Sequence, residues 1–160
     1  TRVAAATLFA MSVAGCERQA STPAAATNQV AASAPAKVAR PDGPERVVLA
    51  FGDSLYAGYG LDRGQSLPDA IQSRLRRAGI NATVVNAGVS GDTTAAGRER
   101  LAFVLDQQKR APDLVMLGLG GNDVLRQISP AETRANMTAM LDELKRRRLP
   151  VLLTLSLIHI

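Results

Sequence analysis

Between residues 46 and 155, short apolar runs alternate with longer segments of helical periodicity, and this alternation limits the fold more than any other feature of the sequence. The runs 46–51, 81–86, 114–119 and 151–155 have the length of strands. Most are nearly continuously apolar, which is typical of strands covered on both faces. Helical segments separate them, so the predicted order is β-α-β-α-β-α-β. Such alternation implies right-handed crossovers, a parallel sheet and a three-layer α/β/α sandwich.

The three predicted helices carry recognisable start and stop signals. Ser66 is a natural N-cap with Asp69 three positions on, and Gly79 follows the last turn. Ser129-Pro130-Ala131-Glu132 has the pattern of a capping box with proline at the first helical position. The second helix is expected over 94–110, and the third is expected to end near Arg147. The residues expected to face the core are Ala70, Ile71, Leu75 and Ala78 in the first helix, Leu101, Val104 and Leu105 in the second, and Met137, Met140, Leu141 and Leu144 in the third.

The composition supports a globular core and argues against a nucleic-acid partner. Hydrophobic residues make up 46% of the chain and aromatic residues only 3%, so the core must consist mainly of Leu, Val and Ala. The formal net charge of +5 could suggest an anionic partner. However, the basic residues cluster near 74–77 and 145–148, at predicted helix C-termini where cations complement the helix dipole. Basic residues interleaved with aromatic ones, which single-strand binding requires, do not occur in the sequence.

The first 44 residues have a composition that does not favour a packed core. Residues 1–15 consist largely of an apolar run with the length of a signal-peptide core. The run ends in Val13-Ala14-Gly15-Cys16, which resembles the lipobox of bacterial lipoproteins and implies lipidation of Cys16. An ordinary signal peptide with a chance cysteine is the alternative. Residues 16–44, rich in Ala, Pro, Ser and Thr, are expected to form a tether. These features predict an exported protein, periplasmic or at the cell surface, held to a membrane through Cys16.

Three loops rich in glycine and small polar residues follow the first three predicted strands. They are Gly52-Asp53-Ser54-Leu55, the segment 87–93 and Gly120-Gly121-Asn122-Asp123. Sites in open parallel sheets form beyond the carboxyl ends of the strands, so we expect these loops to converge there. Acyl transfer needs a nucleophilic hydroxyl and nearby donors for an oxyanion. Ser54 offers the hydroxyl, while the Gly91 N–H and the Asn122 amide offer donors.

The residues of these loops carry a family resemblance. Phe51 to Leu55, Asn86 to Thr93 and Gly120 to Asp123 resemble blocks I, II and III of the GDSL, or SGNH, hydrolases, in their arylesterase, lysophospholipase and acyl-thioesterase branch. The resemblance implies the flavodoxin-like SGNH hydrolase fold and an esterase that acts on small-molecule or lipid carboxylic esters or thioesters through a serine acyl-enzyme. It implies no metal and no organic cofactor. The residues it implicates are the nucleophile Ser54, the oxyanion-hole residues Ser54, Gly91 and Asn122, and the supporting residues Asp53 and Asp123.

One block of the family pattern does not occur in the sequence. The family's last block, Asp-x-x-His, supplies the catalytic base and the carboxylate that orients it. The only histidine is His159, and Ser156 stands three residues before it. The hydrolase domain, residues 45–160, is therefore expected to be incomplete at its C-terminus and inactive as it stands. Asp123 as a makeshift base is disfavoured, because carboxylates are weak bases at neutral pH. Residues 155–160 resemble translated sequencing-adapter read-through.

Two alternatives without catalysis stay open at this point. A flavodoxin-like module could cradle phosphate at helix N-termini. Against it, Gly118 to Asp123 lacks the third glycine of a dinucleotide fingerprint, and the sequence has no Gly-Lys-Ser/Thr phosphate motif. A surface lipoprotein that only binds partners is the other alternative. Labelling of Ser54 by a fluorophosphonate probe distinguishes the hydrolase from both.

Overall fold

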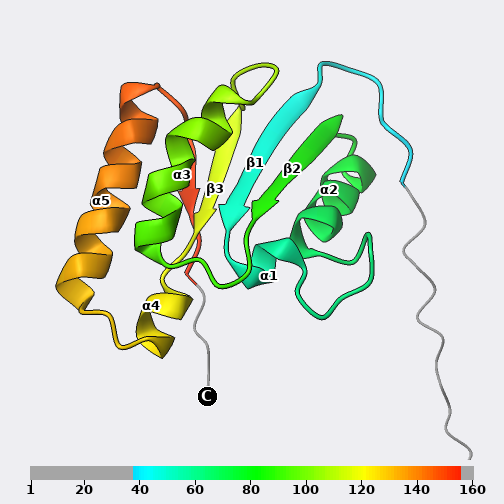
Figure 1. Cartoon of the computed structure of the whole chain (residues 1–160). Helices are drawn as coiled ribbons and strands as arrows, with labels where there is room; N and C mark the ends of the chain where they lie inside the picture. Colours follow the sequence, from blue (N-terminus) through cyan, green and yellow to red (C-terminus); the bar gives the residue numbers. More distant parts are fainter. Residues whose placement is uncertain (1–37, 156–160) are drawn as a thin grey trace, which may run out of the picture. The chain divides into compact units, whose positions relative to one another are not determined.

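Strands and helices alternate along residues 38–155, the part of the chain that the computed structural model describes. The predicted order of the strands and of the three long helices is confirmed, as is the three-layer α/β architecture with a parallel sheet (Figure 1). Two short helices that were not predicted follow the first and third strands. The elements are β1 (Arg46–Gly52), α1 (Ser54–Ala57), α2 (Leu67–Arg77), β2 (Ala82–Gly88), α3 (Thr94–Asp106), β3 (Leu114–Gly118), α4 (Gly121–Leu125), α5 (Pro130–Arg146) and β4 (Val151–Leu153).

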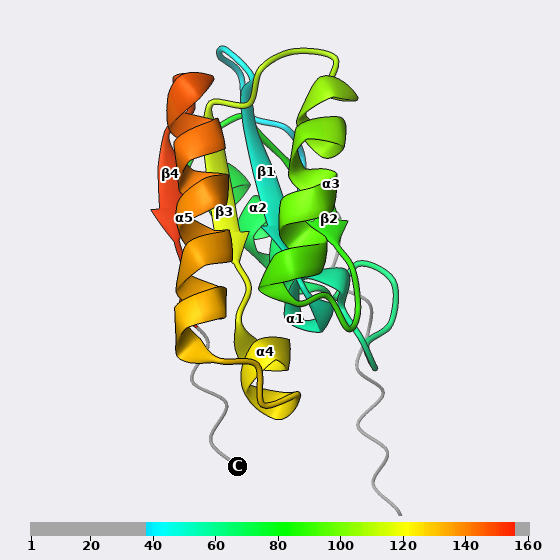
Figure 2. The same cartoon turned by 60° about the vertical axis from the view of Figure 1, so that its left-hand side comes forward.

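The strand order is β2-β1-β3-β4, and every neighbouring pair is parallel. The chain leaves β1 towards one edge of the sheet to form β2, then returns past β1 to form β3 on the other side. Right-handed crossovers therefore place α2 on one face and α3 on the other. Figure 2 shows α3 and α5 side by side in front of the sheet, with α1 and α2 behind it.

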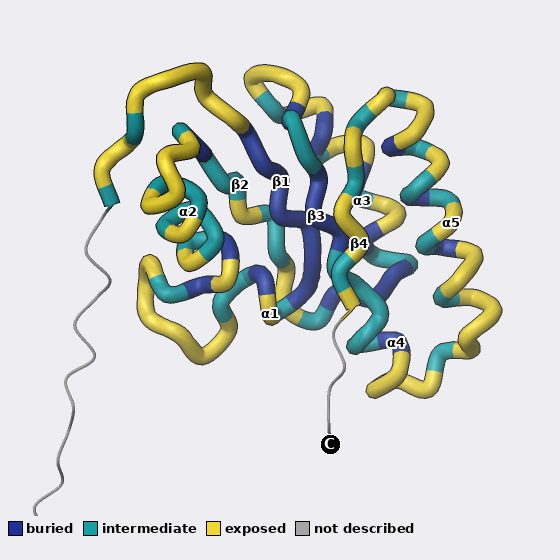
Figure 3. The backbone as a smooth tube through the Cα atoms, turned by 180° about the vertical axis from the view of Figure 1, so that it is seen from behind, coloured by how far each residue is buried: buried dark blue, intermediate teal, exposed yellow. Residues whose placement is uncertain are grey.

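The two faces of β1 point into two different parts of the core, because successive side chains of a strand alternate. Leu49 and Phe51 face α3 and α5. Val48 and Ala50 face α1 and α2. The central strands are the most deeply buried part of the chain, as the dark tube segments in Figure 3 show. The larger cluster consists of Leu49, Phe51, Leu101, Leu105, Val115, Leu117, Met140 and Leu144.

The predicted start and stop signals of the helices are largely confirmed. Ser66 Oγ accepts from the Asp69 N–H at 3.3 Å, and the Asp69 carboxylate accepts in return from the Ser66 N–H at 3.1 Å. Gly79 follows α2 with φ +80°. Ser129 Oγ accepts from the Glu132 N–H at 3.2 Å. Among residues 38–155 the return bond from the Glu132 side chain is not formed, so only the serine half of this capping box is present.

The predicted inner face of α2 is partly wrong. Ala70 and Ala78 are exposed, whereas Ile71 and Leu75 pack against the sheet. Two polar side chains reach the sheet instead: Gln72 Oε1 accepts from the Val84 N–H at 3.0 Å, and Arg76 Nε donates to the Ala82 carbonyl at 2.9 Å. The reason is that β2 is an edge strand, whose outward backbone groups need partners.

Two further elements differ from the prediction in length. Helix α3 ends at Asp106 rather than at Arg110. Residues 107–110 offer no apolar side chain to the core, and the Arg110 guanidinium instead bonds to the Glu45 carbonyl and the Asp113 carboxylate. Strand β4 spans three residues rather than five.

The predictions for the N-terminal region fall mostly outside the part of the chain that the structure describes. The signal peptide (1–15), Cys16 and the tether up to residue 37 lie there. Residues 38–44 contain no helix or strand. Within residues 38–155, no helix is both long and apolar enough to cross a bilayer.

Candidate active site

The three loops singled out in the sequence lie at one end of the sheet, where the strand arrows end in Figure 1. Gly52, Gly88 and Gly118 end β1, β2 and β3, and they are paired in register across the sheet. The chain leaves β1 for one face and β3 for the other, so the crevice between these two strands is a topological switch point. Ser54 follows β1 and Asn122 follows β3, on either side of this crevice.

Ser54 is the first residue of the short helix α1, which turns sharply away from β1. Asp53 caps this helix: its carboxylate accepts from the Leu55 N–H at 3.0 Å, and the side chain is buried. Ser54 itself is half-buried. Among the described residues, its hydroxyl forms no hydrogen bond and its N–H has no protein acceptor. The turn thus presents both the hydroxyl and the N–H of Ser54 without a competing partner in residues 38–155.

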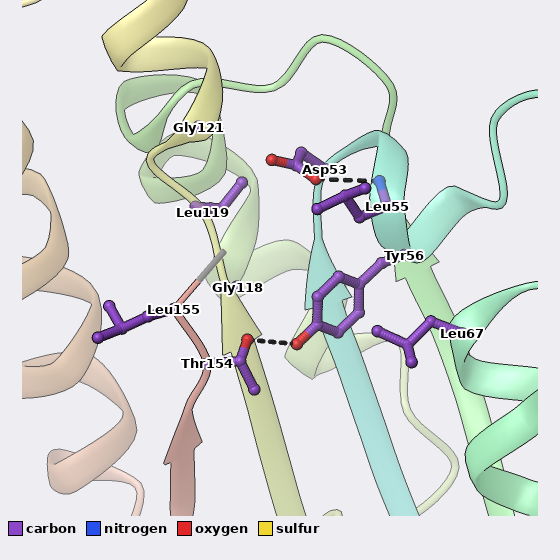
Figure 4. A pocket seen from close by; sticks show the side chains of 9 residues that line it. All are labelled: Asp53, Leu55, Tyr56, Leu67, Gly118, Leu119, Gly121, Thr154 and Leu155. Carbon is purple, nitrogen blue, oxygen red and sulfur yellow. Dashed lines mark hydrogen bonds between the residues drawn. The ribbon is translucent and has the colours of Figure 1, made fainter. Parts of the chain in front are cut away.

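Tyr56 packs this helix against the sheet, a role that its sequence context does not indicate. A Cβ added to Gly118 would lie 2.5 Å from Tyr56 Cε2, and one added to Gly52 would lie 2.6 Å from Tyr56 Cγ and closer still to Cδ2. Only glycine therefore leaves room for the ring over the strand ends. The Tyr56 hydroxyl hydrogen-bonds Thr154 Oγ1 at 2.6 Å, as Figure 4 shows. Burial raises the pKa of the Tyr56 phenol, which stays neutral. The glycines at the ends of three strands are the sequence feature from which this close packing could have been predicted.

Gly91 lies in the loop after β2 and adopts a left-handed backbone conformation with φ +86°. The Gly91 carbonyl accepts from Arg126 Nη2 at 2.9 Å. The loop is joined to the end of β1 by the Val89 N–H, which donates to the Gly52 carbonyl at 3.0 Å. Within the described part of the chain, the Gly91 N–H donates to no protein acceptor.

Asn122 lies near the start of α4 and bonds to the same loop. Its Nδ2 donates to the Asp92 carbonyl at 2.8 Å. A side-chain amide carries two donor hydrogens, so this bond fixes the amide and leaves a second hydrogen to offer. Gly120, in the left-handed conformation with φ +115°, precedes the helix and makes this turn possible. The structure thus brings together the Ser54 turn, the Gly91 loop and Asn122.

Asp123 points away from these groups into a buried polar network. Its side chain is 1% exposed. It accepts from the Thr94 N–H at 2.8 Å, from the Thr94 hydroxyl, and from the Thr133 hydroxyl at 3.1 Å. These bonds tie α4 to the starts of α3 and α5. Such a carboxylate is engaged in fixing the loop rather than free to take a proton.

A cavity of about 190 Å³ opens beside the nucleophile turn (Figure 4). Its wall is mostly apolar, apart from Asp53 and Thr154. A recess of this chemistry suits the hydrocarbon part of a small substrate. The lining residues are Asp53, Leu55, Tyr56, Leu67, Gly118, Leu119, Gly121, Thr154 and Leu155.

No histidine lies near this site within residues 38–155, because His159, the one histidine of the sequence, is outside the described residues. In the same part of the chain, no group of three His, Cys, Asp or Glu side chains is placed to hold a metal ion.

Comparison with known proteins identifies relatives of this chain. The model of the GDSL-like lipase/acylhydrolase family matches residues 50–159. Esterase TesA of Pseudomonas aeruginosa is 41% identical over 108 residues, which cover 68% of this chain and 53% of that protein. An arylesterase of Vibrio mimicus is 41% identical over 98 residues, covering 61% of this chain and 48% of that protein. The chain therefore spans about half the length of these curated relatives.

Solved structures agree with the sequence relatives. The crystal structure of AlinE4, an SGNH-hydrolase family esterase, is 59% identical with a TM-score of 0.68, covering 70% of this chain and 59% of that one. The crystal structure of TesA is 41% identical with a TM-score of 0.63, covering 68% of this chain and 59% of that one. The family match covers well over half of the chain and includes all three loops of the candidate site. The chain therefore belongs to the GDSL-like lipase/acylhydrolase family.

Proposed function

We propose that the full-length gene product is a serine hydrolase of carboxylic esters or thioesters, with Ser54 as its nucleophile. The observation that carries this proposal is the joining of three loops at one sheet end. The Val89 N–H bonds to the Gly52 carbonyl, and Asn122 Nδ2 bonds to the Asp92 carbonyl. The hydroxyl of Ser54 and three donors are thereby held on neighbouring segments: the N–H groups of Ser54 and Gly91, and the side-chain amide of Asn122.

The reaction proceeds in two acyl transfers. Ser54 Oγ attacks the carbonyl carbon while its proton passes to a base, and the three donors stabilise the oxyanion of the tetrahedral intermediate. The intermediate collapses, the alcohol or thiol leaves with a proton, and Ser54 carries the acyl group. Water then attacks this acyl-enzyme, which releases a carboxylic acid and restores the serine hydroxyl. This route requires neither a metal ion nor an organic cofactor.

The cavity and the names of the relatives support a proposal for the substrate class. An apolar wall beside Ser54 favours esters with a hydrocarbon acyl or alcohol group. Relatives bear the names esterase, arylesterase and thioesterase/lysophospholipase. We therefore propose small-molecule or lipid esters as substrates.

The base is the part of the mechanism for which the described residues, 38–155, offer no histidine. An unassisted serine hydroxyl is a weak nucleophile. The residue three before His159 is Ser156, so Asp-x-x-His is not formed, and the Asp123 carboxylate is occupied by Thr94 and Thr133. Loss of the base from a triad costs on the order of 10⁶ in kcat. We expect the 160-residue polypeptide not to hydrolyse esters above a Ser54→Ala control. Turnover that Ser54→Ala abolishes would reveal a base within it.

The decisive experiment uses the full-length gene product. Wild-type protein should hydrolyse a short aryl ester and be labelled by a fluorophosphonate probe. Ser54→Ala should abolish both while leaving the unfolding midpoint nearly unchanged, because one small hydroxyl contributes little packing. Ser73→Ala, on α2, is the matched control and should keep wild-type turnover and labelling. Folded wild-type protein with neither turnover nor labelling would refute the hydrolase, and nucleotide binding by that protein would favour the flavodoxin-like module.

The location of the protein is a second part of the proposal. We propose that residues 1–15 direct export, that Cys16 is lipidated, and that residues 16–44 tether the hydrolase domain to a membrane in the periplasm or at the cell surface. The support is the Val13-Ala14-Gly15-Cys16 motif and the composition of the segment after it. Cys16→Ser should move the protein from the membrane to the soluble fraction and abolish incorporation of a labelled fatty acid. Ser12→Ala is the control. Unchanged membrane partition of Cys16→Ser would favour the ordinary signal peptide instead.

A further inference from the structure

Arg100, in the middle of α3, contacts two of the three segments that carry the proposed oxyanion donors: the end of β1 before Ser54 and the loop after β2. Its Nε donates to the Asp92 carboxylate at 2.6 Å. Its two terminal nitrogens donate to the Ala87 carbonyl at 2.9 Å and to the Gly52 carbonyl at 3.0 Å. The guanidinium carbon lies 3.9 Å from the centroid of the Phe51 ring. One side chain thus bridges the ends of β1 and β2 and the loop that follows β2.

The chemistry of these contacts requires arginine. A guanidinium presents five donors in a rigid planar fork and stacks on aromatic faces, whereas an ammonium is a compact point charge. The side chains of Arg100 and Asp92 are 20% and 11% exposed, so the ion pair is largely shielded from water. Charge-assisted bonds in such surroundings are stronger than those at an open surface.

Two of the contacted residues, Gly52 and Asp92, lie next to or near a proposed oxyanion donor in the chain. The Gly52 carbonyl lies two residues before Ser54. Asp92 follows Gly91 in the chain, and its own carbonyl accepts from Asn122 Nδ2 at 2.8 Å. The position of Asp92 therefore affects two of the three donors, and Arg100 connects Asp92 to the turn that carries the third.

We propose that Arg100, with Asp92 as its counter-ion, is a positioning residue that holds the oxyanion donors in register with Ser54. This inference rests on the proposed function. Arg100 touches no reacting atom; it acts on kcat by fixing the distance between the β1 turn and the β2 loop. Misplacement by about 1 Å can lower the rate of an enzyme by about 10²-fold.

Arg147 provides a matched control. Its side chain is 24% exposed, and its guanidinium bonds to Glu143 at 2.6 Å and to Asp106, joining α5 to the end of α3. It has the same chemistry and similar burial as Arg100, but it contacts none of the three loops. Removing it tests what the loss of a partly buried arginine does to stability alone.

The test measures kcat and KM for a short aryl ester with the full-length gene product, below the Tm of every variant. Arg100→Met should lower kcat by about 10²-fold with little change in KM, because the lost contacts act on transition-state geometry. Arg100→Lys should recover part of the Tm but not kcat. Asp92→Asn, which keeps the shape and removes the charge, should lower kcat about tenfold. Arg147→Met should lower the Tm and keep the wild-type kcat. A wild-type kcat in folded Arg100→Met or Arg100→Lys overturns the proposal.

Amide hydrogen exchange provides a readout that does not depend on turnover. Arg100→Met should accelerate exchange in residues 88–93 and leave residues 137–144 of α5 unchanged. Unchanged exchange in 88–93 overturns the proposal even if kcat falls. If wild-type protein shows no hydrolysis that Ser54→Ala abolishes, the proposed function is wrong, and the exchange measurement still decides whether Arg100 holds these loops.

Discussion

Gly88→Ala tests whether the glycine row at the strand ends fixes the position of Ser54. Gly88 is not among the glycines with positive φ, so alanine is compatible with its backbone. The added Cβ would instead collide with α1: it would lie 2.6 Å from the Tyr56 carbonyl carbon and 2.7 Å from Tyr56 Cβ, and closer still to the Ala57 nitrogen. Ordinary carbon–carbon contact is about 3.5 Å. Helix α1 must therefore move by about 1 Å, because backbone atoms cannot rotate away as a side chain can.

The expected effects of Gly88→Ala are a loss of stability and a larger loss of catalysis. Overpacking of this kind costs about 1–3 kcal/mol in the free energy of unfolding. A shift of Ser54 by about 1 Å lowers kcat by about 10²-fold. Urea unfolding and aryl-ester hydrolysis by the full-length gene product measure the two effects. Gly79→Ala is the control: it meets no atom within 4 Å but forces alanine to φ +80° at the far end of α2. It should cost about 1–2 kcal/mol and leave kcat unchanged. A wild-type kcat in Gly88→Ala would refute the reasoning.

Four further predictions follow from single contacts. Asn122→Ala should lower kcat by about 10²–10³ with a smaller change in KM, since it removes one oxyanion donor; an effect on KM alone would contradict this role. Asp123→Ala should lower the free energy of unfolding by about 1–3 kcal/mol for each buried donor left unpaired, measured by urea unfolding; an unchanged midpoint would show that the network is dispensable. Tyr56→Phe should cost about 0.5–1.5 kcal/mol and keep kcat, so a large loss of turnover would place the phenol in the reaction. The hydrogen bond from the Val47 N–H holds the pKa of the Asp113 carboxyl below its usual value. Its stabilising effect is therefore complete above the unfolded-state pKa and lost as pH falls through the folded-state pKa; Asp113→Asn should lessen the fall of Tm in acid, and an identical fall would refute the assignment.

The architecture could be predicted because local signals and global fold agree. Four apolar runs, two serine caps and Gly79 mark the elements, and alternation leaves few topologies. The boundaries that were wrong depend on contacts between distant segments. Arg110 reaches Glu45 and Asp113 instead of extending α3, and Gln72 reaches β2 although its position on α2 reads as solvent-facing. The hydrophobic periodicity of a single helix does not indicate which distant segment a polar side chain will contact.

The loops of the site were predictable, but what holds them was not. Ser54, Gly91 and Asn122 stand in short motifs with turn-forming residues around them. Arg100, by contrast, reads as one more charged residue on a helix, and Tyr56 as an ordinary aromatic after a turn. Their roles depend on which strand ends lie next to each other. The order β2-β1-β3 makes Gly52, Gly88 and Gly118 neighbours, although the chain separates them by whole helices.

The strand order also determines when the site can form during synthesis. The nascent chain leaves the ribosome N-terminus first, so β1 appears before either of its neighbours and can pair on one side once Gly88 has emerged. Its other side stays open until β3 arrives. Ser54 is therefore made early, but the Asn122 amide joins the Asp92 loop only after two crossovers have closed, and such long-range pairings are slow to form. The proposed nucleophile is thus translated well before the Asn122 amide, and a chain whose synthesis stops before residue 122 contains Ser54 but lacks this donor.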